Sequence, residues 1–217
     1  DEPAIMFKNS QCPVVIGPNR IQAAKYLMEN TDSNVILSDD GLQHFSLGRD
    51  IEILMIDGNR KFGNELLLPA GPLREPKSRI KTVDFTISSN RKWPSVAKYE
   101  MKYRPFKWVH MKSQKEYDIF DWPLKKEVNA VAGIGNPSNF FNLLKQLGFD
   151  ISEYAFPDHH DFHSVDFEIM DNQPTVMTEK DAIKCSFLDH TNYWYLKIEA
   201  EVSDNFEQDF LAEIKSK

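Results

Sequence analysis

Two patterns of hydrophobic and polar positions alternate along the first part of the chain. Short, nearly continuous apolar runs occur at 34–39, 51–57 and 82–88, which is typical of parallel strands buried on both faces. Apolar residues three or four positions apart instead predict a helix over 17–29. The alternation of strands and helices predicts an α/β domain over residues 1–90.

The pattern changes between 91 and 125. Aromatic and basic residues alternate from Lys98 to Arg104 and again after Pro105, which predicts antiparallel strands with one exposed face. We interpret this stretch as a connector between two α/β units. Nucleic-acid stacking is a second interpretation and a membrane-facing patch a third, but the net charge of -7 disfavours a nucleic-acid binder.

The α/β pattern returns after residue 126 and predicts a smaller C-terminal α/β domain over 126–217. The predicted elements are a strand at 128–132, a helix from 140 to 147 that stops at Gly148, a strand at 175–178, a helix starting at Asp181, a strand at 192–198 and a terminal helix at 206–217.

Composition adds few constraints. Hydrophobic residues make up 41% and charged residues 27% of the 217 positions, which is ordinary for a globular protein. Cys12 and Cys185 have no metal-site spacing, which fits a reducing compartment or two buried thiols. No apolar run reaches the roughly 18–20 residues of a membrane span.

The chain begins at Asp1 in a segment typical of the middle of a domain, so we expect it to be truncated.

The strongest candidate for chemistry is the segment Asp39-Asp40-Gly41-Leu42-Gln43-His44. Its two acids follow a predicted buried strand, and ligands bind at that edge of an open α/β sheet. Carboxylate oxygens in this position also suit Mg²⁺ beside a nucleotide. The structural alternative is that the acids cap a turn.

A second candidate combines Phe62-Gly63-Asn64 with the loop Leu68-Pro-Ala-Gly-Pro-Leu-Arg-Glu75. Proline and glycine predict a rigid loop, which orders around a ligand at low entropic cost. Arg74 suits phosphate recognition. A surface turn with a solvated Arg–Glu pair explains the same residues.

Three weaker patterns lie in the C-terminal half. The histidines and aspartates of 157–163 suggest a metal site, a proton-handling His–Asp pair or a polar loop, and their spacing matches no standard zinc site. The glycines of 133–137 precede a helix and suit either an anion or a tight turn, the turn being favoured. Thr178 and Asp181 have the spacing of a helix cap, which we prefer to a catalytic role.

Taken together, these motifs resemble those of the lipid A 4'-kinase (tetraacyldisaccharide 4'-kinase) family, inner-membrane-associated enzymes of Gram-negative bacteria. The matching segments run in order along nearly the whole chain: Asp1-Glu-Pro3, Arg20, Asp39–His44, Phe62–Asn64, Leu68–Glu75, Ala132–Gly135, Asp158-His159 and Met177–Asp181.

The resemblance implies transfer of the γ-phosphate of ATP to the 4'-hydroxyl of a tetraacylated glucosamine disaccharide, a lipid A precursor. It implies an incomplete P-loop-NTPase-like parallel sheet plus the smaller C-terminal domain. The implied location is the cytoplasmic face of the inner membrane, with peripheral attachment mainly through the missing N-terminus, and no nucleic acid is implied as a partner.

The resemblance also implies roles for single residues. Asp39, Asp40 and Glu75 would organise Mg²⁺, and Asp40 is also an implied catalytic residue. Asp1 and His159 would help to deprotonate the sugar hydroxyl, which we expect to require closure of the two α/β units on each other. The implied substrate-binding residues are Arg20, Gln43, His44, Asn64 and Arg74.

The chain departs from the family in three places. It contains no GxxxxGK[S/T] phosphate loop, it lacks the family's N-terminal membrane helix, and Glu65 stands where a glycine is expected. We therefore expect the chain alone to be inactive as a kinase. Two other functions stay open: a phosphohydrolase with an aspartate nucleophile, and a non-catalytic module that binds an anionic sugar or lipid headgroup.

Overall fold

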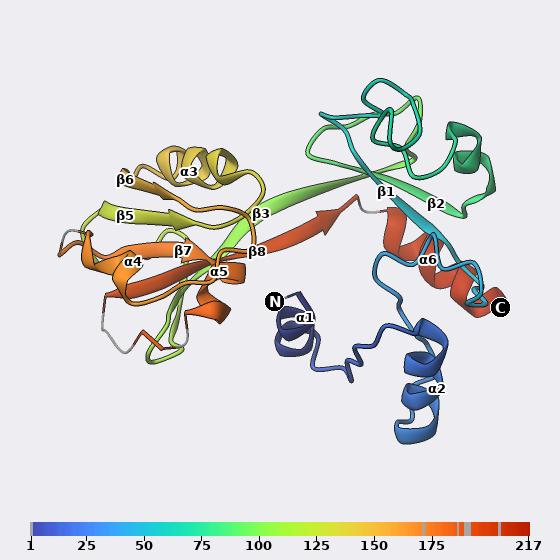
Figure 1. Cartoon of the computed structure of the whole chain (residues 1–217), viewed down its shortest axis with the longest axis horizontal. Coiled ribbons are helices and arrows are strands. Elements are labelled where there is room, and N and C mark those ends of the chain that lie inside the picture. The colour runs from blue at the N-terminus through green and yellow to red at the C-terminus, as the bar shows by residue number, and fades with distance from the viewer. Residues whose placement is uncertain (1, 171, 186, 189–191, 204) are drawn as a thin grey trace. The chain divides into compact units, whose positions relative to one another are not determined.

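The computed structural model describes residues 2–170, 172–185, 187–188, 192–203 and 205–217. They form two compact units, each assembled from two segments of the chain. Unit 1 comprises residues 1–16 and 105–199, and unit 2 comprises residues 17–104 and 200–217. None of the described helices is long and apolar enough to span a membrane. Figure 1 shows the elements along the chain.

Unit 1 contains a mostly parallel sheet. Strand β5 (Glu127–Ala132) lies between β6 (Asp150–Ala155) and β7 (Thr175–Thr178) and runs parallel to both. β7 pairs in parallel with β8 (Tyr193–Val202). The next strand is β3 (Tyr99–His110), which pairs antiparallel with β4 (Glu116–Asp118).

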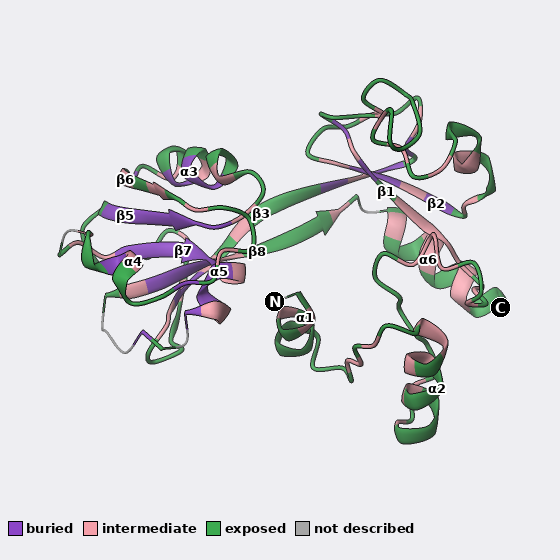
Figure 2. Cartoon of the chain, in the orientation of Figure 1, coloured by how far each residue is buried: buried purple, intermediate pink, exposed green. Residues whose placement is uncertain are grey.

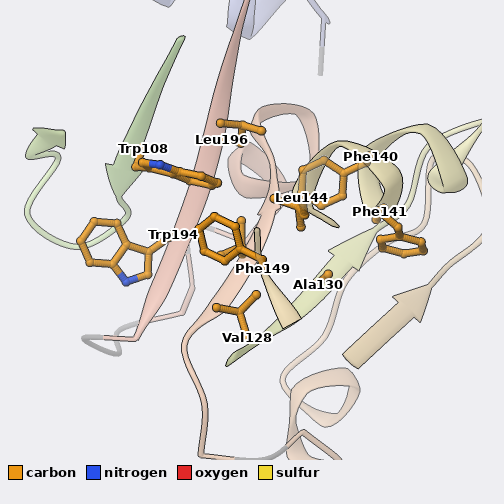
Figure 3. Close-up of a cluster of buried hydrophobic side chains, with 11 residues drawn as sticks. Trp108, Val128, Ala130, Phe140, Phe141, Leu144, Phe149, Trp194 and Leu196 are labelled. Carbon is orange, nitrogen blue, oxygen red and sulfur yellow. The ribbon is translucent and has the colours of Figure 1, made fainter. Parts of the chain in front are cut away.

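The helices of unit 1 are α1 (Glu2–Ser10), α3 (Pro137–Gln146), α4 (Val165–Glu168) and α5 (Glu179–Lys184). The core lies against the faces of β5, which is buried from Val128 to Ala132 (Figure 2). Figure 3 shows one cluster, in which Trp108, Phe149 and Trp194 lie beside Leu144 of α3. A second cluster contains Val131, Phe162 and Met177.

Unit 2 is built on β1 (Ile53–Asp57), β2 (Phe85–Ser89) and the first residues of β3, all paired in parallel. Helix α6 (Asn205–Ser216) packs Phe206 and Phe210 edge-on against Phe85. The unit also contains α2 (Arg20–Asn30) and the 3₁₀ helix η1 (Lys77–Thr82). In the part of the unit that the structure describes, the buried apolar cluster consists of Phe85, Ile87, Tyr99 and Met101, and partly buried side chains such as Phe206 pack against it.

The predicted α/β class is confirmed, and most predicted strands and helices occur within a few residues of their predicted ends. The strand predicted at 34–39 is wrong, because this segment pairs with no described strand and exposes Leu37 by 80%. β3 continues through Pro105 as one strand, and it is antiparallel to β4 but parallel to β2. The domain division at 90 and 125 differs from the two compact units and stays a prediction.

Candidate active site

The segment Asp39–His44 forms turns in unit 2 that place one acid against an arginine from another loop. Asp40 has a left-handed backbone (φ 48°) and is followed directly by Gly41. Nη1 of Arg74 donates to both carboxylate oxygens of Asp40, at 2.7 and 2.8 Å. The two motifs that the sequence singled out are therefore joined by an ion pair.

Gln43 extends this contact to the next acid. Nη1 of Arg74 also donates to Oε1 of Gln43 at 3.2 Å, and Nε2 of Gln43 donates to Oε1 of Glu75 at 2.8 Å. An amide can accept on one side and donate on the other, so Gln43 links a cation to a carboxylate. Four predicted site residues thus form one hydrogen-bonded chain, Asp40–Arg74–Gln43–Glu75.

Three residues that the sequence did not single out complete the network. Arg79 donates Nε to Oε2 of Glu75 at 3.1 Å and pairs through Nη2 with Glu52. Glu52 also pairs with Arg49 at 3.0 Å. Nη1 of Arg49 donates to the backbone oxygen of Leu42 at 2.9 Å, so the contacts return to the loop of Asp40. The one sequence signal for Arg79 was its position four residues after Glu75, a spacing at which opposite charges can pair.

The side chains of the network differ in their exposure to solvent. The side chains of Glu52, Glu75 and Arg79 are 13–21% exposed, whereas those of Arg74 and Asp40 are 56% and 65% exposed. Exposed ion pairs contribute little stability because water competes for both charges. The inner members can therefore fix the loops, while Asp40 and Arg74 face solvent, where a ligand can reach them.

An open pocket of about 320 Å³ lies beside this network. Polar lining comes from Asp40, Gln43, Arg74 and Glu75, and apolar lining from Leu42, Leu54, Phe62, Pro72 and Leu73. A pocket whose lining combines charged and apolar side chains suits a ligand that has both characters.

The remaining predicted substrate-binding residues hold loops in this structure. Nη2 of Arg20 donates to the backbone oxygen of Asp39 at 3.4 Å, and the backbone N–H of His44 donates to Gly41 O at 3.0 Å. Asn64 donates from Nδ2 to Ala70 O at 2.9 Å. Arg20 and His44 thus lie at the same loop as Asp40, and the substrate roles of all three residues stay predictions.

Arg74 also affects the pKa of Asp40. Its hydrogen bond holds the pKa of the Asp40 carboxyl below the ordinary value, against an opposing effect of burial. The carboxylate is therefore ionised throughout the neutral range. An ionised acid and a fixed guanidinium can orient an anionic ligand and its counter-ion.

The predicted magnesium site is not assembled here. Within the part of the chain that the structure describes, no three His, Cys, Asp or Glu side chains form a group that could hold a metal. Arg74 contacts both oxygens of Asp40, and Glu75 accepts from Gln43 and Arg79. The carboxylates of Asp40 and Glu75 are thus occupied by protein donors in this arrangement, and the roles of Asp39, Asp40 and Glu75 as ligands of Mg²⁺ stay predictions.

His159 lies in unit 1, in the left-handed region (φ 60°) beside Asp158. Nζ of Lys180 lies 3.7 Å from Oδ1 of Asp158 and 3.0 Å from Oε1 of Glu2. Lys180 lowers the pKa of Glu2, and His159 adds a smaller effect in the same direction. Lys180, which the sequence analysis did not assign to this site, therefore links the start of α1 to the residue next to His159.

Asp1 itself lies outside the described residues. His159 and the segment that follows Asp1 belong to the same compact unit, and the pairing of Asp1 with His159 stays a prediction. Helix α1 contacts α5 directly, which brings the first residues to this side of unit 1.

Thr178 and Asp181 form the predicted helix cap. Thr178 Oγ1 accepts from the Asp181 N–H at 3.2 Å and donates to Asp181 Oδ2 at 2.7 Å. The same carboxylate oxygen accepts from the N–H of Gly133 at 2.9 Å. The N–H of Gly133 is therefore engaged by Asp181, and the choice between a tight turn and an anion site at 133–137 stays open.

Comparison with known proteins gives a consistent picture. A family model described as "Tetraacyldisaccharide-1-P 4'-kinase" matches residues 1–215. The chain is 46% identical over 212 residues to a tetraacyldisaccharide 4'-kinase of Legionella pneumophila, covering 97% of this chain and 64% of that protein. It is 44% identical over 217 residues to one of Shewanella woodyi, covering 99% and 62%.

A solved structure is also similar. It is described as the "apo" form of LpxK from Aquifex aeolicus in complex with ATP, and it superposes with a TM-score of 0.72 at 26% identity. The match covers 89% of this chain and 61% of that one. The chain thus spans slightly less than two thirds of the length of these relatives.

Proposed function

Because the chain belongs to the tetraacyldisaccharide-1-P 4'-kinase family, we propose that it supplies part of the active site of an ATP-dependent kinase acting on the 4'-hydroxyl of a tetraacylated glucosamine disaccharide. The observation that carries the proposal is the hydrogen-bonded chain Asp40–Arg74–Gln43–Glu75. It joins the motifs at 39–44 and 68–75 beside one open pocket. The proposed setting is the cytoplasmic face of the inner membrane, since the substrate is a lipid.

ATP is the proposed phosphoryl donor, in keeping with the ATP complex of the similar structure. Phosphoryl transfer depends mainly on positioning and on stabilisation of charge. Arg74 supplies a planar cation that suits a phosphate or the charge that develops on it. Gln43 and the pair of Glu75 and Arg79 keep Arg74 at the mouth of the pocket.

Mg²⁺ remains part of the proposal through the oxygen-rich side chains Asp39, Asp40 and Glu75. When bound, the ion would offset the charge of the phosphates. Because the carboxylates now contact Arg74, Gln43 and Arg79, binding would require these contacts to rearrange.

His159 is the proposed proton acceptor for the sugar hydroxyl, with Asp1 as its partner. Imidazole titrates near neutral pH and suits this task. The bridge of Lys180 between Glu2 and Asp158 supports the proposal, because it holds the start of α1 on the same side as the residue preceding His159.

We propose that these 217 residues alone do not transfer phosphate. The sequence contains no GxxxxGK[S/T] loop, so that no backbone cradle and lysine are available for the β- and γ-phosphates.

A chimera tests the proposal. The chain replaces the matching 64% of the Legionella pneumophila relative, and ATP-dependent phosphorylation of tetraacyldisaccharide 1-phosphate is measured for the chimera and for the chain alone. We expect 4'-phosphorylated product from the chimera and none from the chain. A folded chimera without activity would contradict the kinase role, and phosphatase activity of the chain that Asp39→Ala abolishes would indicate a phosphohydrolase instead.

A further inference from the structure

Unit 2 presents an apolar loop to solvent directly beside the candidate site. Leu66, Leu67 and Leu68 are 52%, 47% and 62% exposed. Pro69, Ala70 and Pro72 are exposed as well. Turns normally carry polar residues, and a contiguous exposed apolar patch is typical of an interaction site. We refer to residues Leu66–Leu73 as the leucine loop.

Hydrogen bonds across its base hold the leucine loop in shape. The N–H of Leu68 donates to Leu73 O at 2.9 Å, and the N–H of Leu73 donates to Leu66 O at 3.1 Å. The Asn64 side chain accepts from Leu66 N and donates to Ala70 O. A Cβ on Gly71 would lie 2.2 Å from Oδ1 of Asn64, so only glycine fits there. The loop therefore displays its leucines without needing to be ordered by a partner, which lowers the entropic cost of binding.

The sequence segment that carries the leucine loop is basic, although the chain as a whole is acidic. Three cations of this segment are paired with carboxylates: Arg74 with Asp40, Lys77 with Glu65, and Arg79 with Glu52 and Glu75. Residues 60–81 contain six basic and two acidic side chains, a net charge of +4, within a chain of net charge -7. The basic residues are Arg60, Lys61, Arg74, Lys77, Arg79 and Lys81. An apolar tip flanked by cations matches the surface of an anionic membrane, in which negatively charged headgroups lie above the acyl chains.

We propose that the leucine loop inserts into the surface of a bilayer that contains anionic phospholipids. The biological role of this contact rests on the proposed function, because a lipid substrate must be reached at its membrane. Leu68 pairs with Leu73, and Arg74 follows Leu73 directly. With the leucines at the boundary of headgroups and acyl chains, Arg74 and Asp40 lie at the headgroup level, where a phosphorylated disaccharide is presented.

Sedimentation with vesicles tests this proposal on the 217-residue chain. One set of vesicles is pure phosphatidylcholine, and the other also contains phosphatidylglycerol. The variant Leu66→Ser/Leu67→Ser/Leu68→Ser is compared with wild type and with Val35→Ser/Ile36→Ser/Leu37→Ser. The control replaces three consecutive apolar residues of the same unit that are 50%, 37% and 80% exposed. Circular dichroism checks that all three proteins are folded.

We expect wild type and the control to bind the anionic vesicles, and the leucine variant to bind at least about tenfold more weakly. We also expect Lys61→Gln/Lys77→Gln to weaken binding to anionic vesicles but not to neutral ones. The proposal is overturned if the leucine variant binds as well as wild type, if the control loses as much binding, or if wild type does not bind. It is also overturned if the substitutions change only the oligomeric state, which would indicate a protein partner. Vesicle binding requires neither ATP nor turnover, so a failure of the kinase proposal is a separate result.

Discussion

The two units stabilise their functional side chains in different ways. Among the described residues of unit 1, two buried apolar clusters with eleven and nine members surround the strands that lead to His159 and Lys180. Among those of unit 2, the buried cluster has four members, and the loops of Asp40 and Arg74 are joined by charged hydrogen bonds. Apolar packing gives a rigid scaffold, whereas a half-exposed ionic network can exchange its partners for those of a ligand. The difference predicts that stability and activity respond to different substitutions in the two units.

The largest effect on stability is expected in unit 1. Trp108 is completely buried, contacts Trp122 edge-on and Phe149 at a tilt, and donates from its indole to Ile119 O at 3.0 Å. Trp108→Ala should lower the free energy of unfolding by about 3–5 kcal/mol, measured by denaturant titration. Phe120 is 91% exposed, so Phe120→Ala should change the free energy of unfolding by less than about 0.5 kcal/mol. Equal losses in both variants would contradict the packed-core description of unit 1.

The inner part of the ionic network should contribute an intermediate amount. Arg79→Met leaves Glu52 and Glu75 without their shared cation, and we expect a loss of about 2 kcal/mol in unfolding free energy. Arg79→Lys should recover part of it, because one charged donor remains. Arg60→Met, at an exposed position of the same unit, is the control. A loss no greater than that of the control would show that the network does not hold unit 2.

A smaller and pH-dependent effect is expected at Asp166 in unit 1. Its carboxylate accepts from the N–H of His163 at 2.9 Å and contacts Nε2 of His160 at 3.0 Å, and these bonds lower its pKa. Because the folded-state pKa is depressed, the stabilisation is present above the unfolded value of about 3.9 and is lost as pH falls through the folded value.

Asp166→Asn should therefore cost about 1 kcal/mol at pH 7 and almost nothing well below pH 4, measured by unfolding at a series of pH values. Asp161, whose side chain is 94% exposed, provides the matched variant Asp161→Asn, for which no such pH dependence is expected. A pH-independent loss at Asp166 would argue that the amide disrupts packing rather than charge.

The smallest effect on stability is expected at the exposed pair of unit 2. Arg74→Gln should leave the unfolding free energy nearly unchanged, because water competes for both exposed charges of the pair. It should nevertheless raise the pKa of Asp40 towards its ordinary value, because the Arg74 hydrogen bond is the main cause of its depression. Carboxyl NMR titration of wild type and variant measures this shift. An unchanged Asp40 titration would mean that the ion pair does not persist in solution.

The sequence predicted the packed parts of the fold better than the polar parts of the site. Short apolar runs identified β1, β2, β5 and β7, because burial on both faces leaves a continuous apolar signature. The same pattern wrongly predicted a strand at 34–39. A strand forms only where its backbone can pair with a neighbouring strand, and an apolar composition does not ensure that. β6 escaped prediction, because its alternating Asp150–Ala155 sequence is only partly buried.

For the site, the motifs located Asp40, Gln43, Arg74 and Glu75 but not their supports. Glu52 and Lys180 are common surface residue types whose partners, Arg79 and Glu2, lie on distant segments. Only the three-dimensional arrangement distinguishes them from solvated charges. The capping pair of Thr178 and Asp181 was predictable, because both partners lie within one helical turn.

The central claim is that the exposed pair of Asp40 and Arg74 serves function rather than stability. The most direct test is Asp40→Asn in the chimera with the Legionella pneumophila relative, with unfolding free energy and ATP-dependent phosphorylation of tetraacyldisaccharide 1-phosphate measured on the same preparation. We predict a change in stability below about 0.5 kcal/mol together with a loss of at least about a hundredfold in kcat/KM. A variant that retains near wild-type turnover, or that loses activity only in proportion to a loss of folded protein, would contradict the claim.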